Sequence, residues 1–401
     1  MPEQPRPEDI IERLLAEQRL SRRGFLRKAG ATGLTFSGAA AFLAACGGVE
    51  GTATKTTAET VAVDHPKVPI TQLNFSNWPL YIDKSVIKSF EKEYGGKVKY
   101  TEEINDNQEF FGKVRQQLQQ GQAIGRDIVV LTDYMATRWI RNDYLTPIDK
   151  KNVPNAQNLV EGLRAPNFDP SRQYSLPWQS GMTAIGYNPK RTGGKLSSIN
   201  DIFDPKFKGR VTMLADPHDS ASLMILADGK KTADATIDDV LAAIDRIDEE
   251  NRKGQIRRFT GNDYTTDLAK GNVWISVAYS GDVIQLQADN PELEFLIPDE
   301  GAVLWSDNML MPQKAAHPYA AETMMNYVYE PEIAAKIAAY VNYVTPVIGA
   351  QEELAKTDPE TAENELIFPS DETRAKLNPY PTLSPEDENR MLEAMQKVTG
   401  A

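Results

Sequence analysis

Residues 301–312 read GAVLWSDNMLMP, an extended apolar run that is interrupted by Trp305 and Asp307. One residue separates these two, so on a strand both side chains point to the same face. An indole ring beside a carboxylate suits an organic cation, because the ring offers cation–π attraction and the carboxylate a counter-charge. A core Trp beside a turn-forming Asp would give the same spacing. Other segments must decide between the two interpretations.

The chain also contains a matching extended segment at residues 174–188, which is interrupted by Pro and Gly. We interpret it as the first crossing between two lobes, residues 301–312 as the crossing back, and residues 342–346 as a third passage. A chain of 401 residues is too long for one ordinary core, which favours two lobes. The predicted lobes comprise residues 71–181 with 307–346, and residues 182–306 with 347–401.

Strand and helix patterns alternate in both predicted lobes. This order is typical of a doubly wound α/β fold, in which ligands bind beyond the carboxyl ends of the strands. In the first lobe the strands are expected near residues 71–75, 97–100 and 126–131, and the helices near 86–94, 110–118 and 134–139. In the second lobe, strands are expected at residues 208–214 and 273–278.

Aromatic and hydroxyl residues follow two strands of the first lobe. Trp78 and Tyr81 come after the first strand, and Thr132 and Tyr134 come after the third. Since the carboxyl ends of parallel strands share one edge, we expect these side chains on the same rim. The alternative is that they only form turns and that Thr132 or Asp133 caps the following helix.

Carboxylates follow two strands of the second lobe in the same way. Asp216 and Asp219 come after one strand, and Tyr279 and Asp282 come after the other. The alternative is structural: Asp216 would form a turn, Asp219 would be the N-cap of a helix from about Ser220, and Asp282 would cap another helix.

The composition is that of a globular protein, with 41% hydrophobic and 25% charged residues. A net charge of −13 makes nucleic acid and anionic membranes poor partners and attracts cations. A single cysteine excludes an internal disulfide framework and Cys-based zinc sites. The three histidines are widely spaced, and no HExxH, GxSxG, Walker A or dinucleotide-binding motif is present. These absences argue against an enzyme, a cofactor and a metal site.

The N-terminal 45 residues have the pattern of an export signal. SRRGFLR, residues 21–27, precedes a Gly/Ala-rich apolar run at residues 29–45 and resembles a twin-arginine signal. LAACG, residues 43–47, resembles a bacterial lipobox, which implies lipidation at Cys46. The alternative of a transmembrane anchor is weaker, because the run is barely long enough to span a membrane. Residues 46–70 then predict a flexible tether, in which His65 is expected to be solvated.

Five short motifs, in order over residues 73–343 and just beyond, give the chain a family resemblance. They are NWxxY at 77–81, VVxTxY at 129–134, TAIGYN at 183–188, LWSD at 304–307 and YxTP at 343–346. Together they resemble the spermidine- and putrescine-binding proteins of bacterial ABC importers. The resemblance implies a periplasmic binding protein of type II, with a ligand cleft between two α/β lobes that crossover strands join.

The resemblance also implies site residues. Aromatic walls, a hydroxyl contact and amine-binding carboxylates fall on Trp78, Tyr81, Thr132, Tyr134, Asp216, Asp219, Trp305, Asp307 and Tyr343. A Trp-x-Gly-Asp pattern of the family falls on residues 279–282, which adds Asp282 and places Tyr279 where Trp is usual. No residue of the C-terminal tail matches a polar contact that some members draw from there.

The implied function is capture of a polyamine outside the cytoplasmic membrane and delivery to an ABC permease. The protein is expected to be a monomer, without cofactor or nucleic-acid partner, that touches the membrane only through a lipid at Cys46. Other interpretations stay open on the sequence alone. The same fold could bind an amino acid, an opine, a sugar or a ferric ion. An exported hydrolase could use two cleft carboxylates as acid and base, or a lipoprotein could sense cations.

Overall fold

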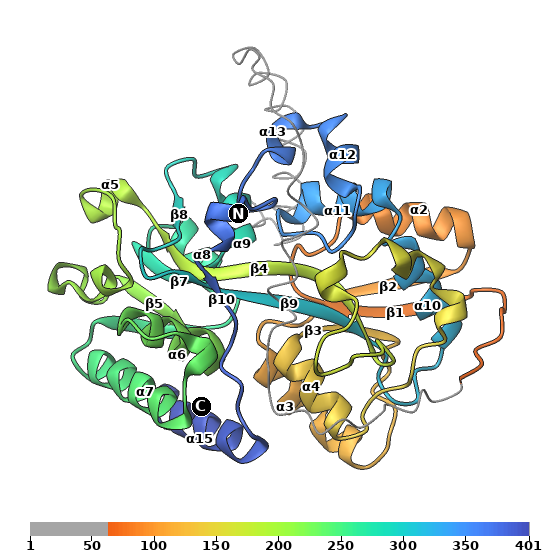
Figure 1. Ribbon diagram of the computed structural model, residues 1–401, viewed down its shortest axis with the longest axis horizontal. Coiled ribbons are helices and arrows are strands. Elements are labelled where there is room, and N and C mark those ends of the chain that lie inside the picture. The colour runs from red at the N-terminus through yellow and green to blue at the C-terminus, as the bar shows by residue number, and fades with distance from the viewer. Residues whose placement is uncertain (1–62, 401) are drawn as a thin grey trace, which may run out of the picture. The chain divides into compact units, whose positions relative to one another are not determined.

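In the computed structural model, which describes residues 63–400, two long buried strands carry the chain between two α/β halves (Figure 1). They are β4 (Ser175–Tyr187) and β9 (Ala302–Leu310), which pair in antiparallel fashion. Every residue of both strands is buried, as the apolar patterns of these segments require. The two predicted crossings are confirmed.

The first half is built on three parallel strands, as predicted. β1 (Gln72–Asn77) pairs on one side with β2 (Lys97–Glu102) and on the other with β3 (Ile128–Thr132). The helices between and after these strands are α2 (Lys84–Tyr94), α3 (Asn107–Gln119) and α4 (Asp133–Arg141). The aspartates Asp83 and Asp106 cap the first two of these helices by accepting hydrogen bonds from backbone N–H groups.

The second half repeats this plan with parallel strands β5 (Val211–Leu214), β6 (Ile256–Thr260) and β7 (Ile275–Tyr279). The sequence reading missed β6, because its charged centre, Arg257 and Arg258, hides a strand pattern. The helices of this half are α5 (Pro189–Thr192), α6 (Pro217–Ala227), α7 (Ile237–Arg252), α8 (Tyr264–Ala269) and α9 (Ser280–Gln287).

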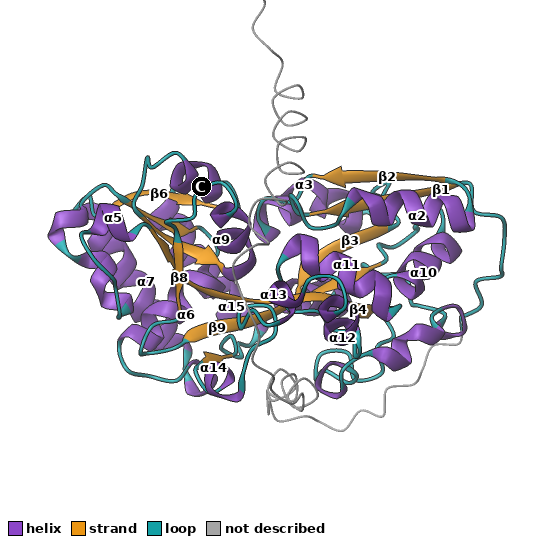
Figure 2. Ribbon diagram, turned by 90° about the horizontal axis from the view of Figure 1, so that it is seen from above, coloured by secondary structure: helices purple, strands orange, loops and turns teal. Residues whose placement is uncertain are grey.

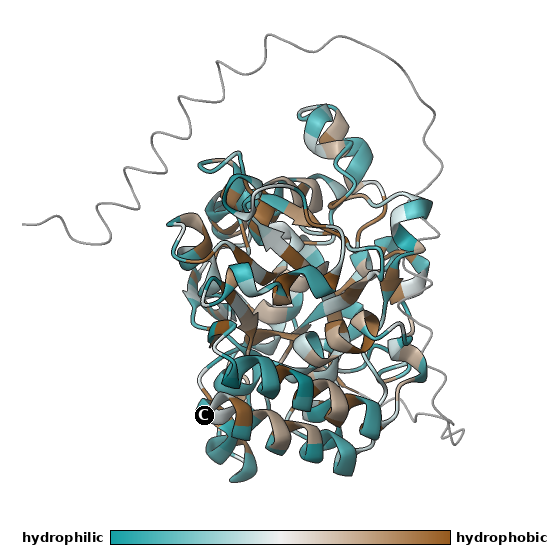
Figure 3. Ribbon diagram, turned by 90° about the vertical axis from the view of Figure 1, so that its left-hand side faces the viewer, coloured by the Kyte–Doolittle hydropathy of each residue, from teal (hydrophilic) through white to brown (hydrophobic). Residues whose placement is uncertain are grey.

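The crossing strands join both halves into one mixed sheet with the order β2-β1-β3-β9-β4-β7-β5-β6. The short strands β8 (Glu294–Leu296) and β10 (Leu377–Asn378) add to β4 and β9. Helices flank the strands on both sides (Figure 2). The hydropathy colouring shows apolar strands inside and mainly polar helices outside (Figure 3). The two-lobed α/β fold is therefore confirmed, with the lobes sharing a continuous sheet.

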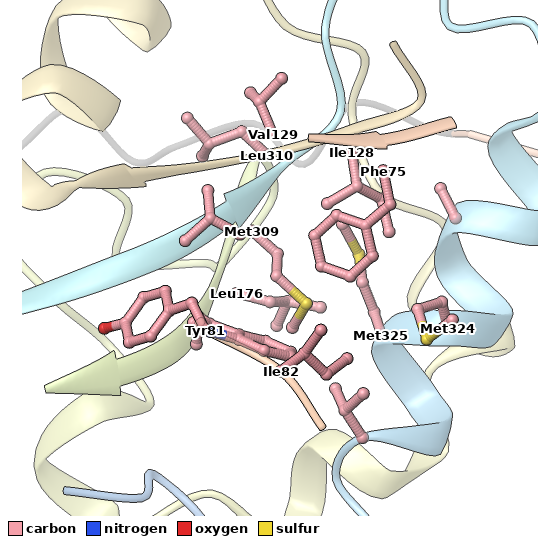
Figure 4. Close-up of a cluster of buried hydrophobic side chains, with 14 of the residues drawn as sticks. Phe75, Tyr81, Ile82, Ile128, Val129, Leu176, Met309, Leu310, Met324 and Met325 are labelled. Atoms are coloured by element: carbon pink, nitrogen blue, oxygen red, sulfur yellow. The ribbon is translucent and has the colours of Figure 1, made fainter. Parts of the chain in front are cut away.

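The C-terminal part of the chain returns to both halves. Its helices are α10 (Pro318–Tyr327), α11 (Pro331–Val341), α12 (Ala350–Ala355), α13 (Pro359–Ala362), α14 (Asp371–Arg374) and α15 (Pro385–Thr399). The third passage lies beside the first crossing, where Ser180 and Val344 exchange two backbone hydrogen bonds of 2.8 and 2.9 Å. Each half has its own hydrophobic core, and part of the first is drawn in Figure 4.

The lobe boundaries stay a prediction, but part of the C-terminal segment packs on the first half. Ala350 and Leu354 pack in the core of the first half, although residues 347–401 were assigned to the second lobe. The predicted tether also stays a prediction, but the expectation for His65 was wrong. His65 is not solvated, because its Nδ1 lies 2.6 Å from the buried carboxylate of Glu322. The predicted signal peptide and Cys46 lie outside the described residues.

No helix within residues 63–400 is long and apolar enough to cross a membrane. No cluster of three or more His, Cys, Asp or Glu side chains among these residues is arranged to hold a metal ion.

Candidate ligand-binding site

A pocket lies where the strand ends of both halves meet the two crossing strands. Its empty volume, which includes the space that opens to solvent at its mouth, is about 370 Å³. Its walls are Trp78, Pro79, Tyr81, Thr132, Asp219, Asn262, Tyr279, Asp282, Trp305, Asp307, Tyr343 and Tyr380. Three of these side chains are acidic, and none is Lys, Arg or His.

Asp307, on β9, is held by two hydroxyl groups of the first half. Thr132 lies opposite it in the β3–β9 pairing and donates to Oδ1 at 2.7 Å. Tyr81 donates to Oδ2 at 2.9 Å. Figure 4 shows the Tyr81 ring at the edge of the hydrophobic core, with its hydroxyl oxygen pointing away from the other side chains. A carboxylate has about four acceptor positions, so Asp307 keeps free lone pairs for a ligand.

Asp219, in the first turn of α6, accepts three hydroxyl hydrogen bonds. They come from Thr183 at 2.6 Å, Tyr380 at 2.8 Å and Tyr279 at 3.1 Å. The Thr183 hydroxyl also accepts a hydrogen bond of 3.0 Å from the indole Nε1 of Trp305. The carboxylate and the indole ring are therefore positioned by the same hydroxyl group.

Asp282, in the first turn of α9, is the third carboxylate. Its Oδ1 accepts from the hydroxyl of Tyr343 at 2.8 Å. Its Oδ2 accepts from Asn262 Nδ2 at 2.6 Å and from Tyr264 at 2.7 Å. Tyr343 belongs to the third passage, so the contact also joins that passage to the second half.

Aromatic rings form the apolar walls between the carboxylates. The ring centroids of Trp305 and Tyr343 are 5.6 Å apart, those of Trp305 and Tyr279 5.4 Å, and those of Tyr81 and Tyr343 5.2 Å. The indole of Trp78 is fixed by a hydrogen bond of 3.1 Å to the backbone oxygen of Val130. Such faces bury methylene groups and attract cations.

Burial makes the charged form of all three acids costly. It raises the pKa of Asp307 to about 7 and that of Asp282 to about 6. Burial and the charge of Asp216 raise the pKa of Asp219 to about 7. The hydroxyl donors oppose this rise without cancelling it. A cation that entered the pocket would restore the ionised forms.

Nine of the eleven predicted site residues line this pocket, and their role as ligand contacts stays a prediction. They are Trp78, Tyr81, Thr132, Asp219, Tyr279, Asp282, Trp305, Asp307 and Tyr343. The structure contradicts two of the alternatives that assigned these residues to helix caps. Thr132 occupies the N-cap of α4 but makes no capping bond, because its hydroxyl binds Asp307. Asp216, and not Asp219, caps α6 by accepting from the His218 N–H.

Tyr134 and Asp216 do not belong to the pocket wall. They instead join the halves, because the Tyr134 hydroxyl on α4 donates to the Asp216 carboxylate before α6. The Tyr134 ring also stacks on His218, with centroids 3.6 Å apart. A further link is the hydrogen bond of 2.9 Å from the Asn262 N–H to the Asn105 backbone oxygen. Direct contacts therefore join the two halves in this structure.

The sequence reading missed Asn262 and Tyr380. Asn262 follows the overlooked strand β6, so finding that strand would have placed it on the same rim. Tyr380 comes from the C-terminal tail, in the segment Pro379-Tyr380-Pro381, which has no periodic pattern. It supplies a polar contact from the tail where none was expected.

Residues 85–369 match the family of bacterial extracellular solute-binding proteins. Because this match spans more than half of the chain, the protein belongs to that family. Solute binding by members of this family agrees with a pocket between the two lobes.

Individual relatives extend over most of the chain. The spermidine/putrescine-binding periplasmic protein of Escherichia coli is 24% identical over 302 residues, 75% of this chain and 84% of its own. A putrescine/cadaverine-binding protein of Pseudomonas aeruginosa is 28% identical over 350 residues, 82% of this chain and 92% of its own. A solved structure from Listeria monocytogenes, provisionally described as a spermidine/putrescine ABC transporter, is 28% identical with a TM-score of 0.73. It aligns with 82% of this chain and 98% of its own.

Proposed function

We propose that the protein captures a polyamine such as putrescine or spermidine in this pocket and delivers it to an ABC permease. The observation that carries the proposal is that three buried carboxylates face a ring-lined pocket without a cationic side chain in its wall. A flexible polycation supplies both missing parts, ammonium groups for the acids and methylenes for the rings. The named ligands of the relatives in Escherichia coli and Pseudomonas aeruginosa support this chemistry.

The same pocket disfavours the other solutes. An amino acid or an opine brings a carboxylate, which would meet three acids and no Lys, Arg or His in the wall. Ferric ions favour ionised tyrosines, but burial and nearby carboxylates raise the pKa of Tyr81, Tyr279 and Tyr343 well above the ordinary value. The tyrosine hydroxyls are also engaged as donors to the acids.

Typical free energies of such contacts are large enough for micromolar affinity. A charge-assisted hydrogen bond contributes about 1.5–3 kcal/mol net, and a cation–π contact about 0.5–2 kcal/mol. Association and ordering cost about 4–15 kcal/mol. Several contacts of each kind are therefore enough for micromolar binding or tighter, about −8 kcal/mol.

Thermal unfolding of the purified protein with putrescine, spermidine, lysine and a disaccharide tests the proposal. Stabilisation by a polyamine alone is expected, and stabilisation by lysine or the disaccharide alone would contradict it.

The affinity for a polyamine is expected to rise as the pH rises. A carboxyl group whose pKa is raised on folding contributes its full stabilisation at pH values below its ordinary pKa. This contribution is lost as the pH rises through the pKa of the folded state, which is about 6 to 7 for the three acids. A polyamine reverses that loss by binding the ionised acids. We expect its affinity to be at least about tenfold higher at pH 8 than at pH 5.5. Calorimetry in buffers of different ionisation enthalpy should detect proton release on binding near pH 6.5. Equal affinity at both pH values would show that the three acids do not bind the ligand.

We further propose that the chain is exported by a twin-arginine signal and anchored by lipid at Cys46, and that it acts as a monomer. The SRRGFLR and LAACG motifs support the first two parts. A lipid-modified residue holds a protein at a membrane without embedding it. A binding protein of this kind hands its solute to a permease and needs no catalytic group.

Replacing Cys46 by Ala is expected to move the protein from the membrane fraction to the soluble fraction and to abolish labelling by a fatty-acid probe. Cell fractionation measures the first effect and gel fluorescence the second. Thr52→Ala, in the same predicted tether, serves as the control and should leave both unchanged. A Cys46→Ala protein that stays in the membrane fraction would contradict lipid anchoring at this residue.

A further inference from the structure

The C-terminal tail runs from β10, beside β9, to α15, beside α7 (Figure 1). Strand β10 pairs with β9 at Leu377 and Asn378, after which the chain runs to α15. The Thr232 hydroxyl donates to the Pro379 backbone oxygen at 2.6 Å and holds this passage against the second half. Further on, Glu388 in α15 binds Arg138 of the first half at 2.5 Å. The tail is therefore fixed on both sides of Tyr380.

Tyr380 is the one tail residue in the pocket wall described by the structure. Its hydroxyl donates to Asp219 Oδ1 at 2.8 Å. Its ring meets the edges of Tyr134 and His218, with both centroid distances at 5.7 Å. The Tyr380 side chain thus stands between the Asp219 carboxylate and the stacked Tyr134–His218 pair.

Further negative charge lies beyond Tyr380. Asp216 accepts from the Tyr134 hydroxyl and from the His218 ring, and it is buried. The imidazole of His218 and the Tyr134 hydroxyl outweigh burial and hold the pKa of Asp216 below its ordinary value. Burial and the charge of Asp216 raise the pKa of Asp106 to about 7. Asp106 and Asp216 are therefore further acids outside the pocket wall, and His218 offsets part of the charge of Asp216.

We propose that Tyr380 is a specificity-determining residue that closes this end of the pocket and limits the length of the bound polyamine. The inference rests on the proposed polyamine-binding function. With the ring in place, a diamine fits among Asp219, Asp282 and Asp307. The third ammonium group of a triamine is kept from the region of Asp106 and Asp216. Without the ring, that ammonium reaches the Tyr134 face and the negative charge behind it.

The test compares putrescine and spermidine affinities of the wild-type protein with those of Tyr380→Ala and Tyr380→Phe. We expect the ratio of spermidine Kd to putrescine Kd to fall at least about tenfold in Tyr380→Ala, the effect of one gained ion-paired ammonium. Tyr380→Phe keeps the ring and should hold the ratio within about threefold of wild type. Tyr319→Ala, a half-buried tyrosine outside the pocket wall, is the matched control and should not change the ratio.

The outcomes separate this inference from the proposed function. A wild-type protein that binds neither polyamine would contradict the function itself. A wild-type protein that binds putrescine, with an unchanged ratio in Tyr380→Ala, would overturn only the role of Tyr380. Thermal unfolding verifies that the variants fold. Tyr380→Leu, which keeps an apolar but shorter side chain, gives the same readout if the alanine variant is unstable.

Discussion

Replacing Asp307 by Asn is expected to weaken polyamine binding by at least about tenfold, and by up to about a hundredfold. The substitution keeps the shape of the side chain and removes the negative charge that an ammonium group would meet. Since Asp307 is only 3% exposed and burial raises its pKa to about 7, its charge is costly in the empty protein. We therefore expect no loss of thermal stability. Calorimetric titration measures the affinity, and an unchanged Kd would remove Asp307 from the site.

Asp127→Asn is the matched control, since Asp127 is equally buried but outside the pocket wall. Its carboxylate accepts from the Asn74 N–H at 2.8 Å and from the His317 N–H at 2.9 Å. Loss of these charge-assisted bonds should cost about 1–3 kcal/mol of stability and leave affinity unchanged. The two variants thus have opposite expected effects on stability and affinity.

Replacing Gly181 by Ala should damage the pocket without changing any polar group. A Cβ atom at this position on β4 would lie 2.5 Å from the Trp305 ring and 2.8 Å from the Tyr343 ring. Both rings are buried among other rings and have little room to move. We expect at least about tenfold weaker binding and a loss of about 1–3 kcal/mol of stability from overpacking. Titration and denaturant unfolding measure the two effects.

Gly112→Ala provides the comparison for that substitution. Gly112 lies on the exposed face of α3, and a Cβ atom there would meet nothing within 4 Å. In a helix interior this change should stabilise the protein by about 0.5–1 kcal/mol and leave affinity unchanged. If Gly181→Ala binds polyamine as tightly as Gly112→Ala does, the two rings do not define the site.

The fold was predictable because its decisive strands are long and apolar. The buried runs of β3, β4 and β9 stand out from polar neighbours, and the alternation with helices fixes parallel pairing within each half. It could not be predicted that both halves share one sheet, because the strand order across the crossings depends on pairing between segments far apart in the chain. The strand β6 was missed because its two adjacent arginines obscure the pattern.

Most of the candidate site could be predicted for a geometric reason. Parallel strands end at one rim, so side chains that follow β1, β3, β5 and β7 converge there. The spacing of Trp305 and Asp307 likewise fixed a common face on β9. These rules use only local position in the chain, which a sequence displays directly.

The errors concern choices that local rules leave open. Either Asp216 or Asp219 could cap α6, and only packing against Thr183 and Tyr279 shows that Asp219 enters the pocket. Tyr134 follows its strand as the other residues do, but the packing of the two halves places it against His218. The position of Tyr380 in the pocket wall depends on the path of the C-terminal tail, and no periodic pattern in the sequence predicts that path.

Calorimetric titration of the purified wild-type protein with putrescine and spermidine tests the central claim most directly, with lysine and a disaccharide as controls. The account predicts saturable binding of at least one polyamine at low micromolar Kd or tighter, and no binding of the controls. No detectable binding of either polyamine, or tighter binding of lysine or the disaccharide, would contradict the account. Only the fold and the family would then remain.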